Sequence, residues 1–365
     1  MKHWVKSTIP RKFAVLACFL ALVGLMLVQS TATKEKHPLY ERQVLAAQIM
    51  EQSLDIIKAA KLERGLPIDR ELDPNETGII GQEFTMITTS IGNLEAKRTS
   101  TSPSFAALLV RLFYEAGLEP GASVAIGASG SFPGLIVATL AACEAMDLDP
   151  LLFYSVGASM YGANIPEFTF IDMLDALHGR DMLPYEILAV SLGSDNDRGD
   201  GMFFPDSQET MMEIARSTGA PFIFAENNAQ SIKERLALYS EYNNQRLPDL
   251  FVNIGGASPN MGNTNASRQI PPGLVTKLPV QTDDPQRGLI LEYLELGVPV
   301  IHLLNIRDLA LKSGILIDPL PLPIIGSEDV YYVTKHNKWL IWGSVMIVLG
   351  ILVLGRKQGR FAQRI

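Results

Sequence analysis

Two uninterrupted apolar runs lie near the ends of the chain. Residues 13–28 and residues 339–355 contain no charged side chain, and Trp339 and Trp342 open the second run as interfacial anchors do. Each run is a little shorter than the ~20 residues that span a bilayer, and snorkelling flanks or a thinner bilayer can cover the difference. Neither run carries a polar stripe, which argues against a core helix of a soluble protein. The pattern predicts one membrane-spanning helix near each terminus.

Between these runs, short apolar segments recur, each closed by a glycine-containing turn and followed by a helical segment. Their spacing is mostly about 30 residues, the length of a βα unit. The segments are continuous rather than alternating, as expected for strands covered on both faces. They predict an α/β fold with a doubly wound, mostly parallel sheet and helices on both faces. The expected strands are residues 124–127, 151–154, 187–190, 221–224, 250–253 and 299–302.

Residues 38–64 predict a long helix, with Pro38 in its first turn and Gly65 just after its end. Its apolar positions recur three and four residues apart. The helix therefore either packs on the domain or forms a membrane-proximal stalk or coiled-coil contact.

The remaining segments complete a division of the chain into five parts. Proline- and glycine-rich residues 65–81 predict a loop, threonine-rich residues 84–90 favour a strand, and residues 104–116 predict a helix. The expected parts are a tail and membrane helix over residues 1–30, a membrane-proximal helix and loop over 31–75, an α/β domain over 76–335, a second membrane helix over 336–355, and a basic tail over 356–365.

Basic residues flank the two apolar runs on their outer sides, and no acidic residue accompanies them. The positive-inside rule then predicts a two-pass cell-membrane protein with both termini in the cytoplasm and the domain outside. The first run could also be a cleaved signal peptide, because small residues follow it at Ser30 to Ala32; either interpretation exports the domain. The basic flank residues are Lys2, Lys6, Arg11, Lys12, Arg356, Lys357, Arg360 and Arg364.

The expected external part is strongly acidic. The whole chain has 31 basic and 39 acidic residues; removing the four basic residues at each end leaves 23 against 39, a net charge of −16. Such a surface repels nucleic acid, so nucleic acid is not an expected partner, and any anionic ligand needs a local basic group or a bound cation. Cys18 lies in the first apolar run and Cys143 in an apolar helical stretch, which leaves no internal disulfide outside the membrane.

The loops after the expected strands are rich in glycine and small polar residues. Because the carboxyl ends of parallel strands meet at one edge of a sheet, these loops would line one crevice. The first of them leads into a helix N-terminus, which favours a carboxylate or phosphate; the alternative is a tight turn with Ser131 as helix N-cap. The candidate ligand-binding residues here are Gly127, Ser129, Gly130, Ser131, Ser159 and Asn164.

Lys97 and Arg98 form a basic pair beside Glu95. In so acidic a domain, such a pair is a natural contact for an anionic polymer or a small carboxylate. The alternative is an exposed loop with ordinary salt bridges. Both residues join the candidate ligand-binding set.

Two further hypotheses concern metal binding and catalysis. Asp195, Asp197 and Asp200 suit a divalent cation, Mg²⁺ or Ca²⁺, although their spacing is not that of an EF-hand and a solvated acidic turn is the alternative. No other cofactor is expected. Ser129 could act as a nucleophile with Asp195 or Asp197 as the acid and His302 as the base, in the chain order of an α/β hydrolase.

Four segments of the chain together resemble the poly-γ-glutamate system protein family: residues 87–100, 125–133, 156–166 and 191–199. The resemblance runs in order through most of the expected external domain. It implies a membrane protein that accompanies the machinery making and exporting γ-linked polyglutamate, an anionic capsule or envelope polymer. It also implies other membrane proteins of that machinery as partners, and it supplies no catalytic residues.

Two classes of function follow. The first is an accessory component of poly-γ-glutamate synthesis or export whose domain binds the polymer or partner proteins. The second is an extracytoplasmic hydrolase or transferase acting on γ-glutamyl amide bonds, with Ser129 as nucleophile. An enzyme needs Ser129 and His302 within hydrogen-bond reach in one pocket, whereas a binding protein needs only a groove with local positive charge.

Overall fold

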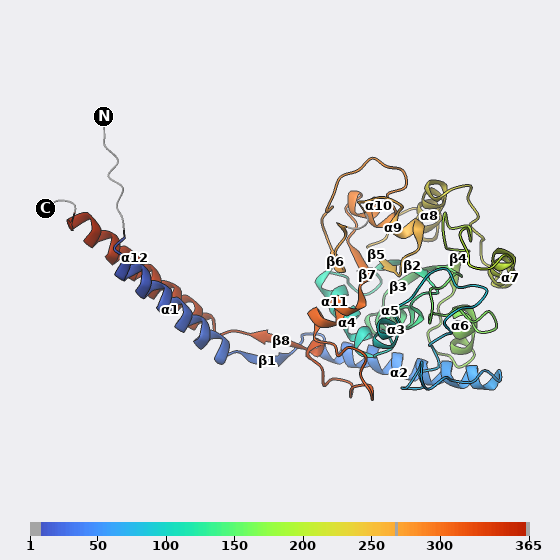
Figure 1. Ribbon diagram of the computed structural model, residues 1–365, viewed down its shortest axis with the longest axis horizontal. Helices are drawn as coiled ribbons and strands as arrows, with labels where there is room; N and C mark the ends of the chain where they lie inside the picture. The colour runs from blue at the N-terminus through green and yellow to red at the C-terminus, as the bar shows by residue number, and fades with distance from the viewer. Residues whose placement is uncertain (1–8, 267–268, 363–365) are drawn as a thin grey trace. The chain divides into compact units, whose positions relative to one another are not determined.

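The computed structural model describes residues 9–266 and 269–362 (Figure 1). The flank residues Lys2, Lys6 and Arg364, and the side chain of Arg360, lie outside this description. The chain forms two compact units. One combines the two ends of the chain, up to His37 and from Tyr332 onward, and the other is Pro38–Tyr331.

The unit formed by the chain ends contains the two apolar runs as helices α1 (Arg11–Ser30) and α12 (Lys338–Ala362). Both are long and apolar enough to cross a membrane. In the most apolar 18-residue stretch of each helix, only 11% of the residues of α1 and 6% of those of α12 are buried, so neither is a core helix. Next to them, β1 (Thr33–Lys36) pairs antiparallel with β8 (Tyr332–Lys335). The chain therefore has the features of a two-pass membrane protein.

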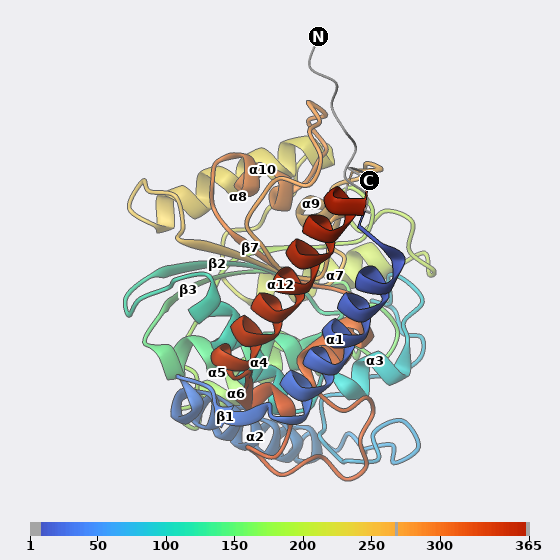
Figure 2. The same cartoon turned by 90° about the vertical axis from the view of Figure 1, so that its left-hand side faces the viewer.

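Helices α1 and α12 lie side by side (Figures 1 and 2). Gly24 is at a point of close approach, since a Cβ there would lie 2.7 Å from the Ser344 Oγ atom. Small residues at such a contact let two apolar helices pack closely without a hydrophobic driving force.

The Pro38–Tyr331 unit is built on a six-stranded sheet in the order β4-β3-β2-β5-β7-β6. The first five of these strands are parallel, and β6 pairs antiparallel with β7 at the edge. This confirms the expected α/β class. The strands are β2 (Ser123–Ser129), β3 (Asp149–Ser155), β4 (Ile187–Ser191), β5 (Leu250–Ile254), β6 (Gly273–Val275) and β7 (Val300–Leu303).

Helices cover both faces of this sheet (Figure 2). On one face, α8 (Asn228–Tyr242) and α10 (Leu289–Glu295) pack on Ala125, Phe153 and Phe251, with Tyr239 of α8 stacked on Phe153 at 3.7 Å between ring centroids. The other face carries α4 (Ser104–Glu115) and α5 (Pro133–Met146). Nearly every α5 residue is buried, because this helix lies between the sheet and further helices.

The long helix α2 (Tyr40–Glu63) forms an outer layer over α4, α5 and α6 (Phe170–His178). Its apolar stripe is buried there, including Ala46, Ala47, Met50, Leu54 and Ile57. Of the two expectations for this helix, packing on the domain describes the arrangement. The shorter helices are α3 (Leu94–Thr99), α7 (Ser207–Ser217), α9 (Ser258–Met261), α11 (Ile306–Ser313) and the 3₁₀ turn η2 (Asp329–Tyr331).

Two expected strands are not formed as such. Residues 221–224 contribute a single parallel bridge, between Phe222 and Val190, and residues 84–90 a single one, between Thr88 and Ala158. The latter segment is held instead by the buried Asn164 side chain. Its amide bonds to the backbone of Gln82 at 2.7 and 2.9 Å and to the Thr88 hydroxyl at 3.0 Å.

Candidate functional site

The strand order places a topological switch point between β2 and β5. From β2 the chain builds outward through β3 and β4, then returns to the other side of β2 and continues through β5 and β7. The connections on the two sides of this point diverge, which leaves a crevice beyond the carboxyl ends of β2 and β5. Ligands of open α/β sheets bind at such points.

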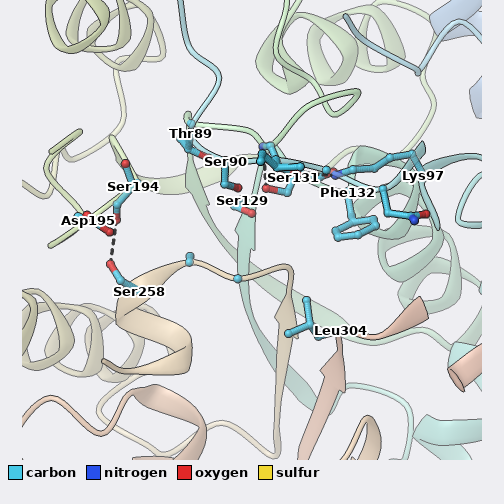
Figure 3. A pocket seen from close by; sticks show the side chains of 18 of the residues that line it. Thr89, Ser90, Lys97, Ser129, Ser131, Phe132, Ser194, Asp195, Ser258 and Leu304 are labelled. Carbon is cyan, nitrogen blue, oxygen red and sulfur yellow. Dashed lines mark hydrogen bonds between the residues drawn. The ribbon is translucent and has the colours of Figure 1, made fainter. Parts of the chain in front are cut away.

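A cavity of about 420 Å³ occupies this position (Figure 3). That volume suits a ligand of the size of an amino acid or a short peptide. Loops after β2, β3, β4 and β5 line it, together with the segment that leads into α3. Its polar lining is mostly hydroxyl groups, from Thr89, Ser90, Ser129, Ser131, Ser159, Ser194 and Ser258.

Lys97 brings a cation to this cavity from the last turn of α3. It is 2% exposed, and its ammonium donates to the Ser159 Oγ atom at 2.7 Å and to the Ser131 carbonyl oxygen. The ammonium also lies 3.8 Å from the centroid of the Phe132 ring. All these partners are neutral, and no acidic side chain of the described residues pairs with Lys97. Burial lowers the pKa of this ammonium to about 7.

Ser129 and Ser131 stand at the carboxyl end of β2, as expected. The Ser129 hydroxyl is buried, faces the cavity, and has no hydrogen-bond partner within the described residues. Gly255, at φ +85°, lets the loop after β5 approach it, because a Cβ there would lie 2.6 Å from the Ser129 Oγ atom. A buried hydroxyl without a partner is costly, so a ligand that bonds to it gains affinity.

Ser131 does not cap the following helix. Its hydroxyl accepts the Ser159 N–H at 3.1 Å, and the N-cap position of α5 is Phe132, with Pro133 as the first helical residue. The Leu135 and Ile136 N–H groups bond to the Phe132 carbonyl. The positive charge at this end of the sheet is therefore Lys97 rather than the start of the helix.

Three other expected ligand-binding residues have structural roles and do not line the cavity. Gly127 lies within β2, where a Cβ would be 2.6 Å from the Asn260 side chain, and Gly130 is equally close-packed against Ala158. Asn164 holds residues 82–88, as described above, and so positions the next residues, Thr89 to Asn93, along the cavity wall.

The structure separates the two members of the basic pair. Arg98 pairs with Asp318 through two hydrogen bonds, one of them from Nε to Oδ1 at 2.7 Å, and it does not line the cavity. The bond to Asp318 raises the pKa of the Arg98 guanidinium. Arg98 is thus separated from the cavity that Lys97 lines, and its charge is already neutralised within the protein.

The three aspartates after β4 do not come together as a cation site, and the described residues hold no cluster of three metal-ligating side chains. Asp197 points into the core and is 2% exposed. Its carboxylate pairs with the Arg235 guanidinium at 2.8 Å and accepts hydrogen bonds from the Ser191 and Ser231 hydroxyls at 2.7 Å each. Asp200 bonds to Asn196 at 3.3 Å, and only Asp195 lines the cavity. Pairing of Asp197 with Arg235 removes the central ligand of the expected divalent-cation site.

His302 is not a base for Ser129. It lies on β7, aligned with Asn253 of β5, which in turn aligns with Gly127 of β2, so one whole strand separates it from Ser129. Its Nδ1 atom is 2.9 Å from the Asn253 amide, and burial lowers the pKa of the imidazole to about 4. The imidazole is a neutral core group, and the structure does not assemble the expected triad.

The loop from Gly256 to Ser258 lines the cavity, as expected for a loop after one of the predicted strands. Sequence reasoning missed the segment from Thr89 to Asn93. This segment carries no local signal, because its place depends on Asn164, a residue far along the chain.

No protein-family model, no curated protein and no solved structure matches this chain. The assignment of a function therefore rests on the site itself.

Replacing Asp197 with alanine is expected to destabilise the protein by about 3–5 kcal/mol, because it leaves the Arg235 charge buried without a partner. Thermal unfolding of the full-length protein in detergent, followed by circular dichroism, measures the change. The control is Glu63→Ala, which breaks the exposed Arg180–Glu63 pair and should have little effect. Equal shifts for the two variants would contradict the role given to Asp197.

Lys97 should make stability rise with pH. Its pKa is about 7 in the folded protein against 10.5 as the ordinary value, so between these pH values the unfolded chain binds a proton that the folded protein does not. Unfolding then takes up a proton, and stability should rise from pH 7 to 10 by on the order of a few kcal/mol. Denaturant titrations at several pH values test this. In the Lys97→Met variant, the increase in unfolding free energy between pH 7 and 10 that comes from Lys97 should be absent. If the variant and the wild type show the same dependence of unfolding free energy on pH, this prediction is refuted.

Proposed function

We propose that this protein is a membrane-anchored component of poly-γ-glutamate synthesis or export, and that its α/β domain binds a carboxylate ligand in the cavity at the β2–β5 switch point. The observation that carries the proposal is the buried Lys97 ammonium at the cavity, with neutral partners only. A ligand carboxylate supplies the missing negative charge.

The energetics favour such a ligand. A buried charge without a counter-ion is unfavourable, and its attraction to an arriving anion is stronger in a poorly hydrated cavity than in water. Carboxylate binding should raise the pKa of Lys97 again, so the ligand and the proton bind together. The hydroxyl-rich walls, including the unpartnered Ser129, offer hydrogen bonds to the remaining polar groups of the ligand.

This arrangement also fits the charge of the chain. With a net charge of −16 between the two apolar runs, the mean field of the domain repels polycarboxylates at distances up to about a Debye length, ~8 Å at physiological salt. Binding then depends on one enclosed cation rather than on a basic surface. The polymer itself comes from the family resemblance of four segments, each of which contributes to the cavity wall: residues 87–100, 125–133, 156–166 and 191–199.

The proposed location is the outer side of a cell membrane, with both termini in the cytoplasm and other membrane proteins of the same machinery as partners. The two apolar helices and their basic flanks support this orientation. A hydrolase with Ser129 as nucleophile is not favoured, because His302 is held on the far side of β5.

Lys97→Met should lower the affinity for γ-linked oligoglutamate by at least about tenfold, since it removes the charge-assisted contact. Isothermal titration calorimetry on the full-length protein in detergent measures this. Lys233→Met is the matched control. Lys233 is exposed on α8, and this substitution changes the net charge of the protein by the same amount as Lys97→Met.

A chelator such as EDTA should leave binding unchanged, since the residues that the structure describes hold no cluster of three metal-ligating side chains through which a cation could bridge. If Lys97→Met binds as tightly as the wild type, the cavity is not the carboxylate site. If wild-type protein binds no oligoglutamate, the domain has another ligand.

The orientation predicts the behaviour of fusion proteins. Alkaline phosphatase, which is active only outside the cytoplasm, should be active when fused after Lys335 and inactive when fused after the last residue of the chain. Measuring phosphatase activity in intact cells checks both. The opposite pattern would place the domain in the cytoplasm.

A further inference from the structure

Two charged side chains line the cavity, Lys97 and Asp195; the rest of the lining described by the structure is neutral. Figure 3 shows them at opposite ends, with the side chains of Ser90, Ser129 and Ser131 between them. The cavity is therefore polarised, with a buried cation at one end and a carboxylate at the other.

Neither charge is neutralised by the protein. The hydrogen-bond partners of Lys97 are a carbonyl and a hydroxyl. No group among the described residues donates a hydrogen bond to the Asp195 carboxylate, which is exposed at the mouth of the cavity. Its two acidic neighbours differ in this respect, since Asp197 pairs with Arg235 and Asp200 bonds to Asn196.

Asp195 is held in place by its backbone rather than by its side chain. The loop after β4 is closed by bridges between Gly193 and Arg198 and between Asp195 and Asp200. The Ser258 hydroxyl, in the loop after β5, donates to the Ser194 carbonyl at 3.0 Å (Figure 3). This hydrogen bond joins the loops after β4 and β5 at the Asp195 end of the cavity. The backbone of Asp195 is thus held at the cavity while its carboxylate oxygens stay available.

We propose that the cavity takes a ligand that carries both a free ammonium group and a carboxylate several bonds away, with the ammonium at Asp195 and the carboxylate at Lys97. The amino-terminal end of a γ-linked glutamyl peptide is such a ligand. This inference rests on the proposed function and names which part of the polymer is bound.

The chemistry follows from the two ends. The two charges of a simple α-amino acid lie on adjacent carbon atoms. A γ-glutamyl peptide keeps that α-carboxylate beside its terminal ammonium and carries further carboxylates beyond the amide, so its ammonium and a second carboxylate can lie much further apart. The hydroxyls between the ends can bond to that amide. The interior of a long polymer offers carboxylates but no ammonium, so the site distinguishes an amino terminus from the rest of the chain.

The test compares γ-glutamylglutamate with its N-acetyl derivative, which keeps all three carboxylates and the γ-linked amide but has no ammonium. Calorimetric titration of the full-length protein in detergent should show the acetylated peptide binding about tenfold more weakly than the free one. Asp195→Asn should weaken binding of the free peptide by a similar factor and leave binding of the acetylated peptide unchanged. Asp200→Asn is the matched control, since it removes the same charge from the same loop outside the cavity lining and should change neither affinity.

The possible outcomes distinguish a failure of this inference from a failure of the proposed function, carboxylate binding at Lys97. Equal affinity of wild-type protein for the two peptides would overturn it, and so would an Asp195→Asn variant that binds both peptides like the wild type. Sensitivity to Lys97→Met in either case would leave the carboxylate site standing. Absence of binding of both peptides to the wild type would overturn the proposed function and this inference together. Circular dichroism of each variant verifies that the fold is retained.

Discussion

Pairing of β2 with a parallel neighbour on each side is the constraint that organises the domain. Its seven residues are buried on both faces and both edges, which restricts them to small or apolar side chains and leaves chemistry only at the strand's end. Because the chain departs toward β3 and returns at β5, the loops after four strands open at the same edge. The hydroxyl-lined cavity is a direct result of that strand order, and Gly255 permits the two central loops to meet.

Three sites in the domain show different treatments of a buried ionisable group. Arg235 and Asp197 neutralise each other, and serine hydroxyls satisfy their remaining bonds. His302 is kept neutral, with a side-chain amide at its Nδ1 atom. Lys97 has no counter-ion and is only partly neutral, since its hydrogen-bond partners are uncharged and burial lowers its pKa to about 7. The contrast within one domain is what makes Lys97 the centre of the site, because the fold can pair buried charges and does not pair this one.

Much of the fold was predictable from the sequence, and about half of the site was. Continuous apolar runs identified β2, β3, β4, β5 and β7, whereas β6 offers only the three residues Gly273–Val275 and takes its place by pairing at the sheet edge. Strand-end loops identified Ser129, Ser131 and Ser159. Lys97 and Arg98 are neighbours in the sequence, yet successive residues of a helix point about 100° apart, so one faces the cavity and the other Asp318, far along the chain. Long-range pairings of this kind, like that of Asp197 with Arg235, leave no trace in a local pattern.

The pairing of β1 with β8 has a consequence for how the protein is made. The two strands are separated by nearly the whole chain, so β1 leaves the ribosome long before its partner exists. The first apolar helix can enter the membrane at once, but the ladder beside it can close only after the entire Pro38–Tyr331 unit has been synthesised. Translation order thus makes the apolar helix α12 the last element to be added, at a time when the domain has already been able to fold.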